Sequence, residues 1–252
     1  MGSLIAFFSR VFYRLLAAGD RRRRFALAVR WSRPLAPLLR SVPAYRKPVF
    51  SLDTDREHAL SFLLNSMTFR GIEFDPATEV RGADEVLERA ASGGLLLLTG
   101  HFYLNYLFCR WLYDRRIAMS SVMITERPVW CYTGTKVPFE TIPPTKRALV
   151  HVKRRIAEGK IVTVAIDNYF PYENWRRVET ARREIYMSEN IIRFAVKNEI
   201  PIGFFATYMT PDERIVTELV AAPAGSVEAV FRAFDRFVDR HLAIRENEGR
   251  TH

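Results

Sequence analysis

Residues 93–106 read GGLLLLTGHFYLNY, and this stretch decides the fold class of the chain. Two glycines precede the short apolar run 95–99, which is typical of a buried β-strand. His101 follows that strand after a single glycine, Gly100. A histidine in this place is either a hydrogen-bonded residue of the core or a general base, since an unperturbed imidazole titrates near pH ~6.5.

The segments around this strand predict a chain in which buried strands alternate with helices. Apolar and β-branched runs predict strands at 95–99, 118–124, 161–166, 201–208 and 215–219. Apolar residues at helical spacing predict helices at 54–70, 83–91, 103–113, 147–158, 188–197 and 226–245, and the polar stretches predict loops at 126–146 and 168–187. We therefore expect one α/β domain with a central mixed, largely parallel sheet flanked by helices and preceded by an N-terminal amphipathic helix.

The composition is that of a globular and strongly basic chain. Its 252 residues are 48% hydrophobic and 26% charged, and the formal net charge is +10. Such an excess of basic groups favours an anionic partner: nucleic acid, an anionic membrane surface or an acidic protein. Because no zinc spacing, recognition helix or aromatic-sheet signature accompanies the basic residues, nucleic acid is not the partner we expect. The two cysteines, Cys109 and Cys131, form no metal spacing, and Cys109 is interpreted as a buried free thiol.

The first part of the chain combines apolar and basic residues. Residues 4–18, LIAFFSRVFYRLLAA, carry Arg10 and Arg14 inside a largely apolar stretch. A spanning helix needs about 20 consecutive apolar residues, and a signal peptide has its charges before its apolar core. The pattern predicts either an amphipathic helix in the membrane interface or a helix packed on the domain's own core.

A second basic stretch, 25–41, is predicted to be helical but broken at Pro34 and Pro37. We expect residues 1–45 to form a membrane-associating helical segment and residues 46–252 to form the α/β domain. The membrane surface in this expectation is anionic, since arginine side chains reach toward lipid phosphates.

Two ionisable side chains, those of His101 and Asp167, come directly after predicted strands. Ligand sites in open α/β sheets collect at the carboxyl ends of the strands, so both residues are candidates for catalysis. Asn105 and Tyr106 follow His101 by about one helical turn, where their side chains can orient its ring. Gly100 allows a substrate or another part of the backbone to approach closely.

These residues belong to an ordered set of segments that resembles a known family. The stretch GGLLLLTGHFYLNY resembles the first signature of the lipid A biosynthesis acyltransferases, in which a buried strand leads to a histidine with an acid five residues later. ITERPVW (124–130) occupies the place of the family's arginine-bearing segment. RALVHVKRRIAEGKIVTVAIDN (147–168) and SENIIRFAVKNEIPIGFFATY (188–208) resemble two later segments. The resemblance covers roughly residues 70–222.

What the resemblance implies is acyl transfer. A fatty acyl group carried on an acyl carrier protein or on coenzyme A moves to a hydroxyl or amine of a lipid-like or natural-product acceptor. His101 is then the general base, and an apolar tunnel near the helix that follows it holds the acyl chain. Glu126 and Arg127 match the arginine segment, where Arg127 can hold a phosphate, and Asn168 stands where the family often has glutamine. The family uses no metal or redox cofactor.

The chain departs from the family pattern at the acid, because Tyr106 occupies the expected position. A carboxylate stabilises the imidazolium that forms during proton abstraction, whereas a neutral phenol or amide fixes only the tautomer. Three interpretations remain open. Asn105 or Tyr106 orients His101; or a carboxylate from elsewhere, Asp167 or Glu126, takes the role; or the protein binds acyl chains without catalysing a reaction.

The expected function is that of a peripheral acyltransferase at the cytoplasmic face of a bacterial inner membrane, with His101 as base. The alternative is a non-catalytic protein of the same fold that binds acyl chains or acyl carrier protein. Basic residues of 153–155 and of 176–183 predict a surface for an acidic carrier protein or for anionic headgroups, although such residues also occur on any solvated face.

Overall fold

The computed structural model describes residues 12–42, 52, 54–123, 140–167, 175–179 and 184–246, without the side chains of 175, 177–179, 184, 185 and 242–246. The helices are α2 (Arg21–Ser41), α3 (Asp55–Phe69), α4 (Ala83–Ala91), α5 (Asn105–Asp114), α6 (Ala148–Ala157), α7 (Asn190–Lys197) and α8 (Val227–Glu246). The strands are β1 (Thr78–Arg81), β2 (Leu95–Thr99), β3 (Met119–Val122), β4 (Glu140–Ile142), β5 (Ile161–Ala165), β6 (Trp175–Glu179), β7 (Glu184–Ser188), β8 (Ile202–Met209) and β9 (Ile215–Ala221).

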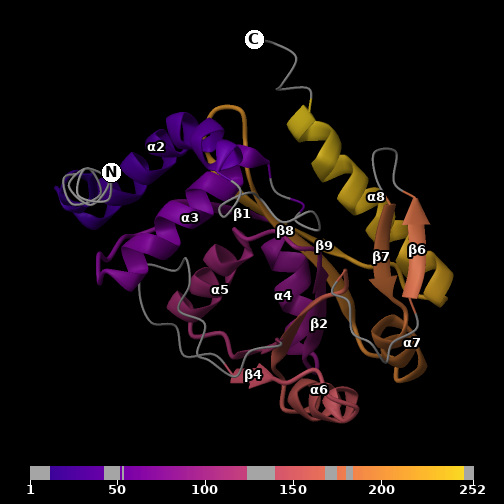
Figure 1. Ribbon diagram of the computed structural model, residues 1–252. Coiled ribbons are helices and arrows are strands. Elements are labelled where there is room, and N and C mark those ends of the chain that lie inside the picture. Colours follow the sequence, from indigo (N-terminus) through magenta and orange to yellow (C-terminus); the bar gives the residue numbers. More distant parts are fainter. Residues whose placement is uncertain are drawn as a thin grey trace.

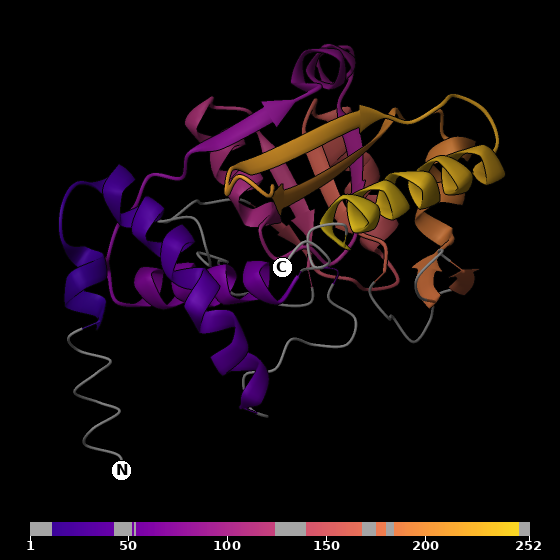
Figure 2. The same ribbon diagram turned by 90° about the horizontal axis from the view of Figure 1, so that it is seen from above.

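Seven of these strands form one sheet in the order β1-β9-β8-β2-β5-β3-β4. All neighbouring strands in this sheet are parallel except β8 and β9. In both views α2 and α3 lie together on one flank of the sheet, and α7 and α8 lie on the other (Figure 1 and Figure 2). The predicted α/β class with a mixed, largely parallel sheet is confirmed.

The central strand β2 explains why helices cover both faces of the sheet. All five of its residues are buried, and successive side chains of a strand point to opposite faces. Leu95 and Leu97 pack with residues of α4 and α5, whereas Leu96 and Leu98 pack with residues of α6, α7 and α8. A strand with no polar face therefore has an apolar layer on each side, as its sequence predicts.

A third apolar cluster joins α2 and α3 to the start of α5 and to the turn between β8 and β9. The helix α3 begins at a capping box, in which the Thr54 hydroxyl accepts from the Glu57 backbone N–H and the Glu57 carboxylate accepts from that of Thr54. The other oxygen of Glu57 accepts from the Met209 backbone N–H at 2.7 Å. Glu57 is fully buried and thus ties the helix pair to the carboxyl end of β8.

The helix α2 corrects one prediction, because it runs without a break through Pro34 and Pro37. Each proline removes the hydrogen bond to the carbonyl four residues earlier, at Arg30 and Arg33. All four of these residues are exposed, so water can satisfy both carbonyls. The opposite face of α2 packs on α3, which holds the helix straight enough to continue.

Two further corrections concern strands in segments where loops were predicted. The strand β4 lies within the predicted loop 126–146. The strands β6 and β7 form a separate antiparallel pair in the predicted loop 168–187, and β7 extends one residue past it, to Ser188. A further strand, β1, lies in a stretch for which no element was predicted; it precedes α4 and pairs with β9. These strands are short and charged, so they lack the apolar run by which the central strands are predicted.

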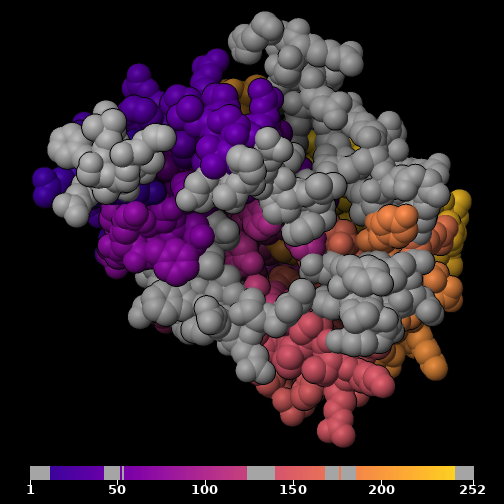
Figure 3. Space-filling model, in the orientation of Figure 1, coloured from indigo at the N-terminus to yellow at the C-terminus, as the bar shows by residue number. Residues whose placement is uncertain are grey.

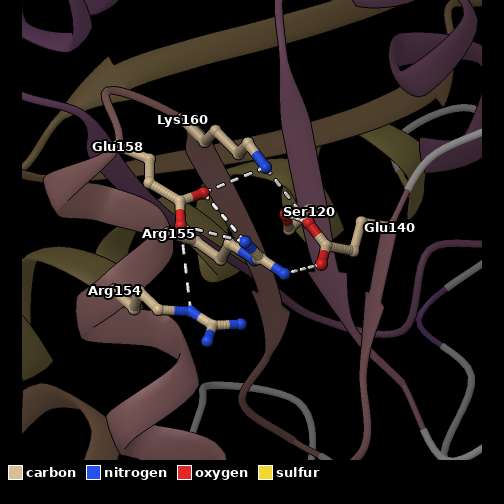
Figure 4. A network of polar contacts seen from close by, with 6 residues as sticks. All are labelled: Ser120, Glu140, Arg154, Arg155, Glu158 and Lys160. Carbon is tan, nitrogen blue, oxygen red and sulfur yellow. Dashed lines mark hydrogen bonds and ion pairs between the residues drawn. The ribbon is translucent and has the colours of Figure 1, made fainter.

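The edge strand β4 is held by a network of charged side chains (Figure 4). Glu140 begins β4, forms an ion pair with Arg155 of α6 and lies 3.2 Å from the Lys160 ammonium. Glu158 bridges the same two cations, with its Oε2 atom 2.9 Å from Arg155 and 3.1 Å from Lys160. The network lies at the amino ends of β4 and β5, away from the strand ends where a site is expected.

The predicted N-terminal amphipathic helix falls largely outside the described residues. Residues 12–17 are helical, and residues 4–11 are not described. Over the described part of the chain, no helix combines the length and apolar character needed to cross a membrane.

Candidate functional site

The site is built by the register of two neighbouring strands. In the pairing of β2 with β5, Thr99 lies opposite Ala165. The chains continue side by side, because the Ile166 backbone N–H donates to the Thr99 carbonyl at 2.9 Å. His101 and Asp167 each lie two residues beyond these partners, so the parallel pairing brings them together at the carboxyl edge of the sheet.

The carboxylate of Asp167 holds both the ring and the backbone of His101. Its Oδ1 atom lies 2.7 Å from the ring Nδ1 of His101. Its Oδ2 atom accepts a hydrogen bond from the His101 backbone N–H, also at 2.7 Å. The Asp167 side chain is only 4% exposed and that of His101 is 19% exposed. The imidazole thus has a fixed orientation, with a buried carboxylate on one ring nitrogen.

This geometry distinguishes among the three interpretations of the missing acid. The carboxylate that contacts His101 comes from Asp167, which is 66 residues away in the chain. Tyr106 lines the same cavity as His101, and its predicted role in orienting the ring stays a prediction. Glu126, Arg127 and Asn168 lie outside the described residues, so their predicted roles in substrate binding also stay predictions.

The prediction that Asn105 orients His101 is corrected. The Asn105 amide nitrogen donates to the Thr99 hydroxyl at 2.7 Å, and its oxygen accepts from the Thr207 backbone N–H at 2.8 Å. Asn105 is the first residue of α5 and is 8% exposed. Its side chain points into the sheet, where both ends of the amide link α5 to β2 and β8. Asn105 is therefore a support of the site's frame.

Gly100 lies in a tight space between Leu52 and the carboxylate of Asp167. A Cβ atom at this position would lie 2.3 Å from Cδ1 of Leu52 and 3.2 Å from Oδ2 of Asp167. The first distance is far below van der Waals contact, and the second would press on the carboxylate. The predicted close approach at Gly100 is thus made by the protein's own side chains, and Gly100 also lines the cavity.

A cavity of about 470 Å³ opens beside the His101 ring. Its volume falls within the range of roughly 300–1,000 Å³ that is usual for small-molecule sites. It lies between α5 and the strands β2, β3, β5 and β8, and its lining is mainly apolar and aromatic: Phe102, Tyr103, Tyr106, Cys109, Val122, Met123, Val164, Ala165 and Phe205. Figure 3 shows the surface hollowed beside α3, with magenta atoms of the β2–α5 region at the bottom.

Sequence reasoning missed part of this lining, namely Ser121, Thr163 and Phe205. Ser121 and Thr163 are register partners in β3 and β5. A signal for them was present, because Thr163 is a polar residue inside an otherwise apolar strand and Ser121 belongs to a pair of serines within an apolar run. A polar residue on a strand that is expected to be buried indicates that its side chain faces a cavity or a hydrogen-bond partner.

Cys109 lies on the wall of the cavity as a buried free thiol, as its sequence context predicts. Burial raises the pKa of this thiol to about 12, and only the thiolate reacts with disulfide reagents. In a Cys131→Ser variant, we expect 5,5′-dithiobis(2-nitrobenzoic acid) to leave the folded protein unmodified at neutral pH and to modify Cys109 after unfolding. Rapid reaction of the folded variant at neutral pH would contradict the buried position of Cys109.

The basic residues predicted to bind a carrier protein are engaged within the fold. Lys153 donates to the Asn198 side chain at 2.8 Å, and Arg155 belongs to the Glu140 network. Arg176 forms an ion pair with Glu228 at 2.6 Å. The side chains of Arg177, Arg182 and Arg183 are not described. Of the described members of this set, Arg154, Arg155 and Arg176 are paired with carboxylates, whereas Lys153 contacts a neutral amide.

Comparison with known protein families and curated sequences gives no match, so a proposal about function rests on the geometry of the site. No protein-family model matches the chain, and no curated protein sequence matches it either. Among the described residues, no three His, Cys, Asp or Glu side chains lie close enough together to hold a metal ion. The chemistry that the described site offers is that of a histidine paired with a buried carboxylate at the mouth of an apolar cavity.

Proposed function

We propose that the protein is an acyltransferase that moves a fatty acyl group from a thioester of acyl carrier protein or coenzyme A to a hydroxyl or amine of a lipid-like acceptor. The observation that carries this proposal is the pair of His101 and Asp167, whose ring and carboxylate are joined at 2.7 Å beside the apolar cavity. The pair supplies a base for proton abstraction, and the cavity supplies an environment for an alkyl chain.

In this mechanism Asp167 holds the proton of His101 on Nδ1, so that Nε2 is the atom that accepts a proton. The acceptor oxygen or nitrogen attacks the thioester carbonyl carbon while its proton moves to Nε2. The tetrahedral intermediate then collapses with cleavage of the carbon–sulfur bond, and the imidazolium returns the proton to the thiolate that leaves. Asp167 stabilises the imidazolium between these two steps, as the carboxylate does in other histidine-based acyl transfer.

The order of the sequence segments supports the same proposal from a separate direction. The segments that resemble lipid A biosynthesis acyltransferases contain His101 in the first and Asp167 in a later one. The fold brings these two segments together through β2 and β5. An apolar cavity beside the ring favours a role for His101 in substrate chemistry over a purely structural role.

The proposal is tested by incubating the purified protein with acyl-coenzyme A and acyl-carrier-protein thioesters and a panel of lipid hydroxyls and amines. Mass spectrometry then detects the acylated product. We expect the wild type to form product and His101→Ala to form none above background, while His151→Ala on α6 retains the wild-type rate. Circular dichroism of both variants checks that each is folded.

Two results would contradict the proposal. Product formation by a folded His101→Ala protein at the wild-type rate would remove the histidine from the mechanism. Tight binding of a fatty acyl chain by the wild type, without transfer from any thioester to any acceptor in the panel, would favour the non-catalytic acyl-binding protein.

A further inference from the structure

The helix α2 carries an unusual concentration of positive charge. Its sequence, RRRRFALAVRWSRPLAPLLRS, contains seven arginines and no acidic residue. Two of the arginines have carboxylate partners, namely Arg21 with Glu73 and Arg40 with Asp55.

Three other arginines of this helix, Arg22, Arg30 and Arg33, are exposed. Within the described part of the chain, no carboxylate lies within ion-pairing distance of these three side chains. Their charge is therefore available to a partner, unlike that of Arg155 on α6, which is paired with two carboxylates.

An apolar stripe runs along α2 beside these arginines. Trp31 and Leu38 lie seven residues apart, which places them on one face of the helix, and Val42 directly follows the last residue of the helix. The side chains of Trp31, Leu38 and Val42 are 40%, 62% and 41% exposed. The ring of Phe12 packs edge-on against Trp31, with the ring centroids 5.3 Å apart.

This stripe is separate from the apolar face that α2 buries. The buried residues of α2 include Phe25, Ala28 and Ser32, which face α3. Arg56 of α3 fixes this packing, since its guanidinium donates to the Ser32 hydroxyl at 3.2 Å and to the Val29 carbonyl at 3.3 Å. The helix therefore presents its arginines and its second apolar stripe to the outside in a fixed orientation.

We propose that the exposed face of α2 docks on the surface of an anionic lipid bilayer. Apolar and aromatic side chains next to arginines suit the membrane interface, where the apolar groups enter the boundary of the acyl chains and the guanidinium groups reach the phosphates. Trp31 is the residue type enriched at that depth. An acidic protein would pair with the arginines, but the exposed apolar side chains of Trp31 and Leu38 beside them match the layered chemistry of a bilayer better.

Docking through α2 would hold the domain that carries the candidate site at the membrane surface. The apolar cluster under α2 includes Leu104 and Leu107, which belong to the segment that follows His101. A lipid-like acceptor would then diffuse in the same surface on which the protein rests. The docking itself rests on α2 alone, so it holds whether or not the protein is an acyltransferase.

The experiment measures binding of the full chain to vesicles by sedimentation, with no acyl donor present. One vesicle is an equimolar mixture of phosphatidylcholine and phosphatidylglycerol, and the other is phosphatidylcholine alone. We expect stronger binding to the anionic vesicle and weakening as salt is added. The triple variant R22Q/R30Q/R33Q is expected to bind the anionic vesicle about a hundredfold more weakly, since each basic group near such a surface contributes about fivefold.

Matched variants separate α2 from general changes in charge or surface polarity. The triple variant K146Q/K197Q/R236Q removes the same charge from exposed positions on other elements and should bind like the wild type. Leu38→Glu should weaken binding at least tenfold. Val150→Glu alters a side chain of similar exposure, 68% against 62% for Leu38, on α6 and should have little effect.

The outcome that would overturn the proposal is equal loss of binding in the α2 variants and their controls, or no loss in either. Equal loss would show that the net charge, and not this helix, drives binding. Unchanged binding of R22Q/R30Q/R33Q and Leu38→Glu would place the lipid contact elsewhere in the chain. Neither result depends on acyl transfer, so failure here is distinct from failure of the proposed enzyme activity.

Discussion

Replacing Asp167 with Asn is expected to lower the rate of acyl transfer by roughly four orders of magnitude, the size of effect seen when the carboxylate of a histidine-based triad becomes an amide. The His101 backbone N–H donates to one oxygen of the carboxylate, so the amide oxygen of Asn must face that N–H. The amide nitrogen then faces Nδ1 of His101 and donates to it. This forces the ring proton onto Nε2, and the nitrogen that should accept the acceptor's proton already carries one.

The measurement is the turnover number and the Michaelis constant of Asp167→Asn with the best thioester and acceptor. We expect the turnover number to fall while the Michaelis constant changes little, because Asp167 contacts the base and not the acyl chain. Asp84→Asn, at an exposed position in the first turn of α4, is the matched control and should retain full activity. A folded Asp167→Asn protein with near-wild-type turnover would show that the carboxylate only supports the fold, and Tyr106 or Glu126 would then be examined as the partner of His101.

The two members of this pair were within reach of sequence reasoning, but their pairing was not. His101 and Asp167 each follow an apolar run that is readily recognised as a strand. Their contact depends on β2 and β5 being neighbours in the sheet and on Thr99 lying opposite Ala165. Strand order and register arise from packing between distant segments, and a single sequence carries no local signal for either.

Asn105 illustrates the opposite problem, in which local spacing misleads. One helical turn after His101 is a sensible position for an orienting partner, yet the turn between β2 and α5 directs the Asn105 side chain toward Thr99 and Thr207. Thr207 is 102 residues further along the chain. Its backbone N–H is a buried donor that requires an acceptor, and meeting that requirement decides where the Asn105 amide lies.

The helix α2 shows that the rule by which proline interrupts a helix also depends on tertiary contacts. Pro34 and Pro37 predict an interruption, and their local effect is real, since each removes one backbone hydrogen bond. The rule does not include the packing of α2 on α3 or the solvent exposure of the freed carbonyls. Where tertiary contacts bury one face of a helix and water satisfies the other, a proline is tolerated inside it.

Replacing Asn105 with Ala is expected to lower the free energy of unfolding by about 3 kcal/mol. The substitution leaves buried polar groups without hydrogen-bond partners, and each such group costs roughly 1–3 kcal/mol. The Thr207 backbone N–H loses its acceptor, and Thr207 is fully buried. The Thr99 hydroxyl loses its donor inside the sheet. For a chain of this size, such a loss corresponds to a fall in melting temperature of roughly 6–12 °C.

Thermal and urea unfolding of Asn105→Ala and of Asn198→Ala measure this effect against a matched control. Asn198 also uses both ends of its amide, accepting from Lys153 and donating to the Phe194 carbonyl, but it does so in a partly exposed position at the end of α7. Its removal should cost less than about 1 kcal/mol, since water replaces the lost partners. If Asn105 instead orients His101, as its spacing first suggests, then Asn105→Ala would lose turnover while keeping the wild-type melting temperature. The support role requires the reverse order of effects: loss of stability first, and loss of turnover only to the extent that the frame around His101 and Asp167 loosens.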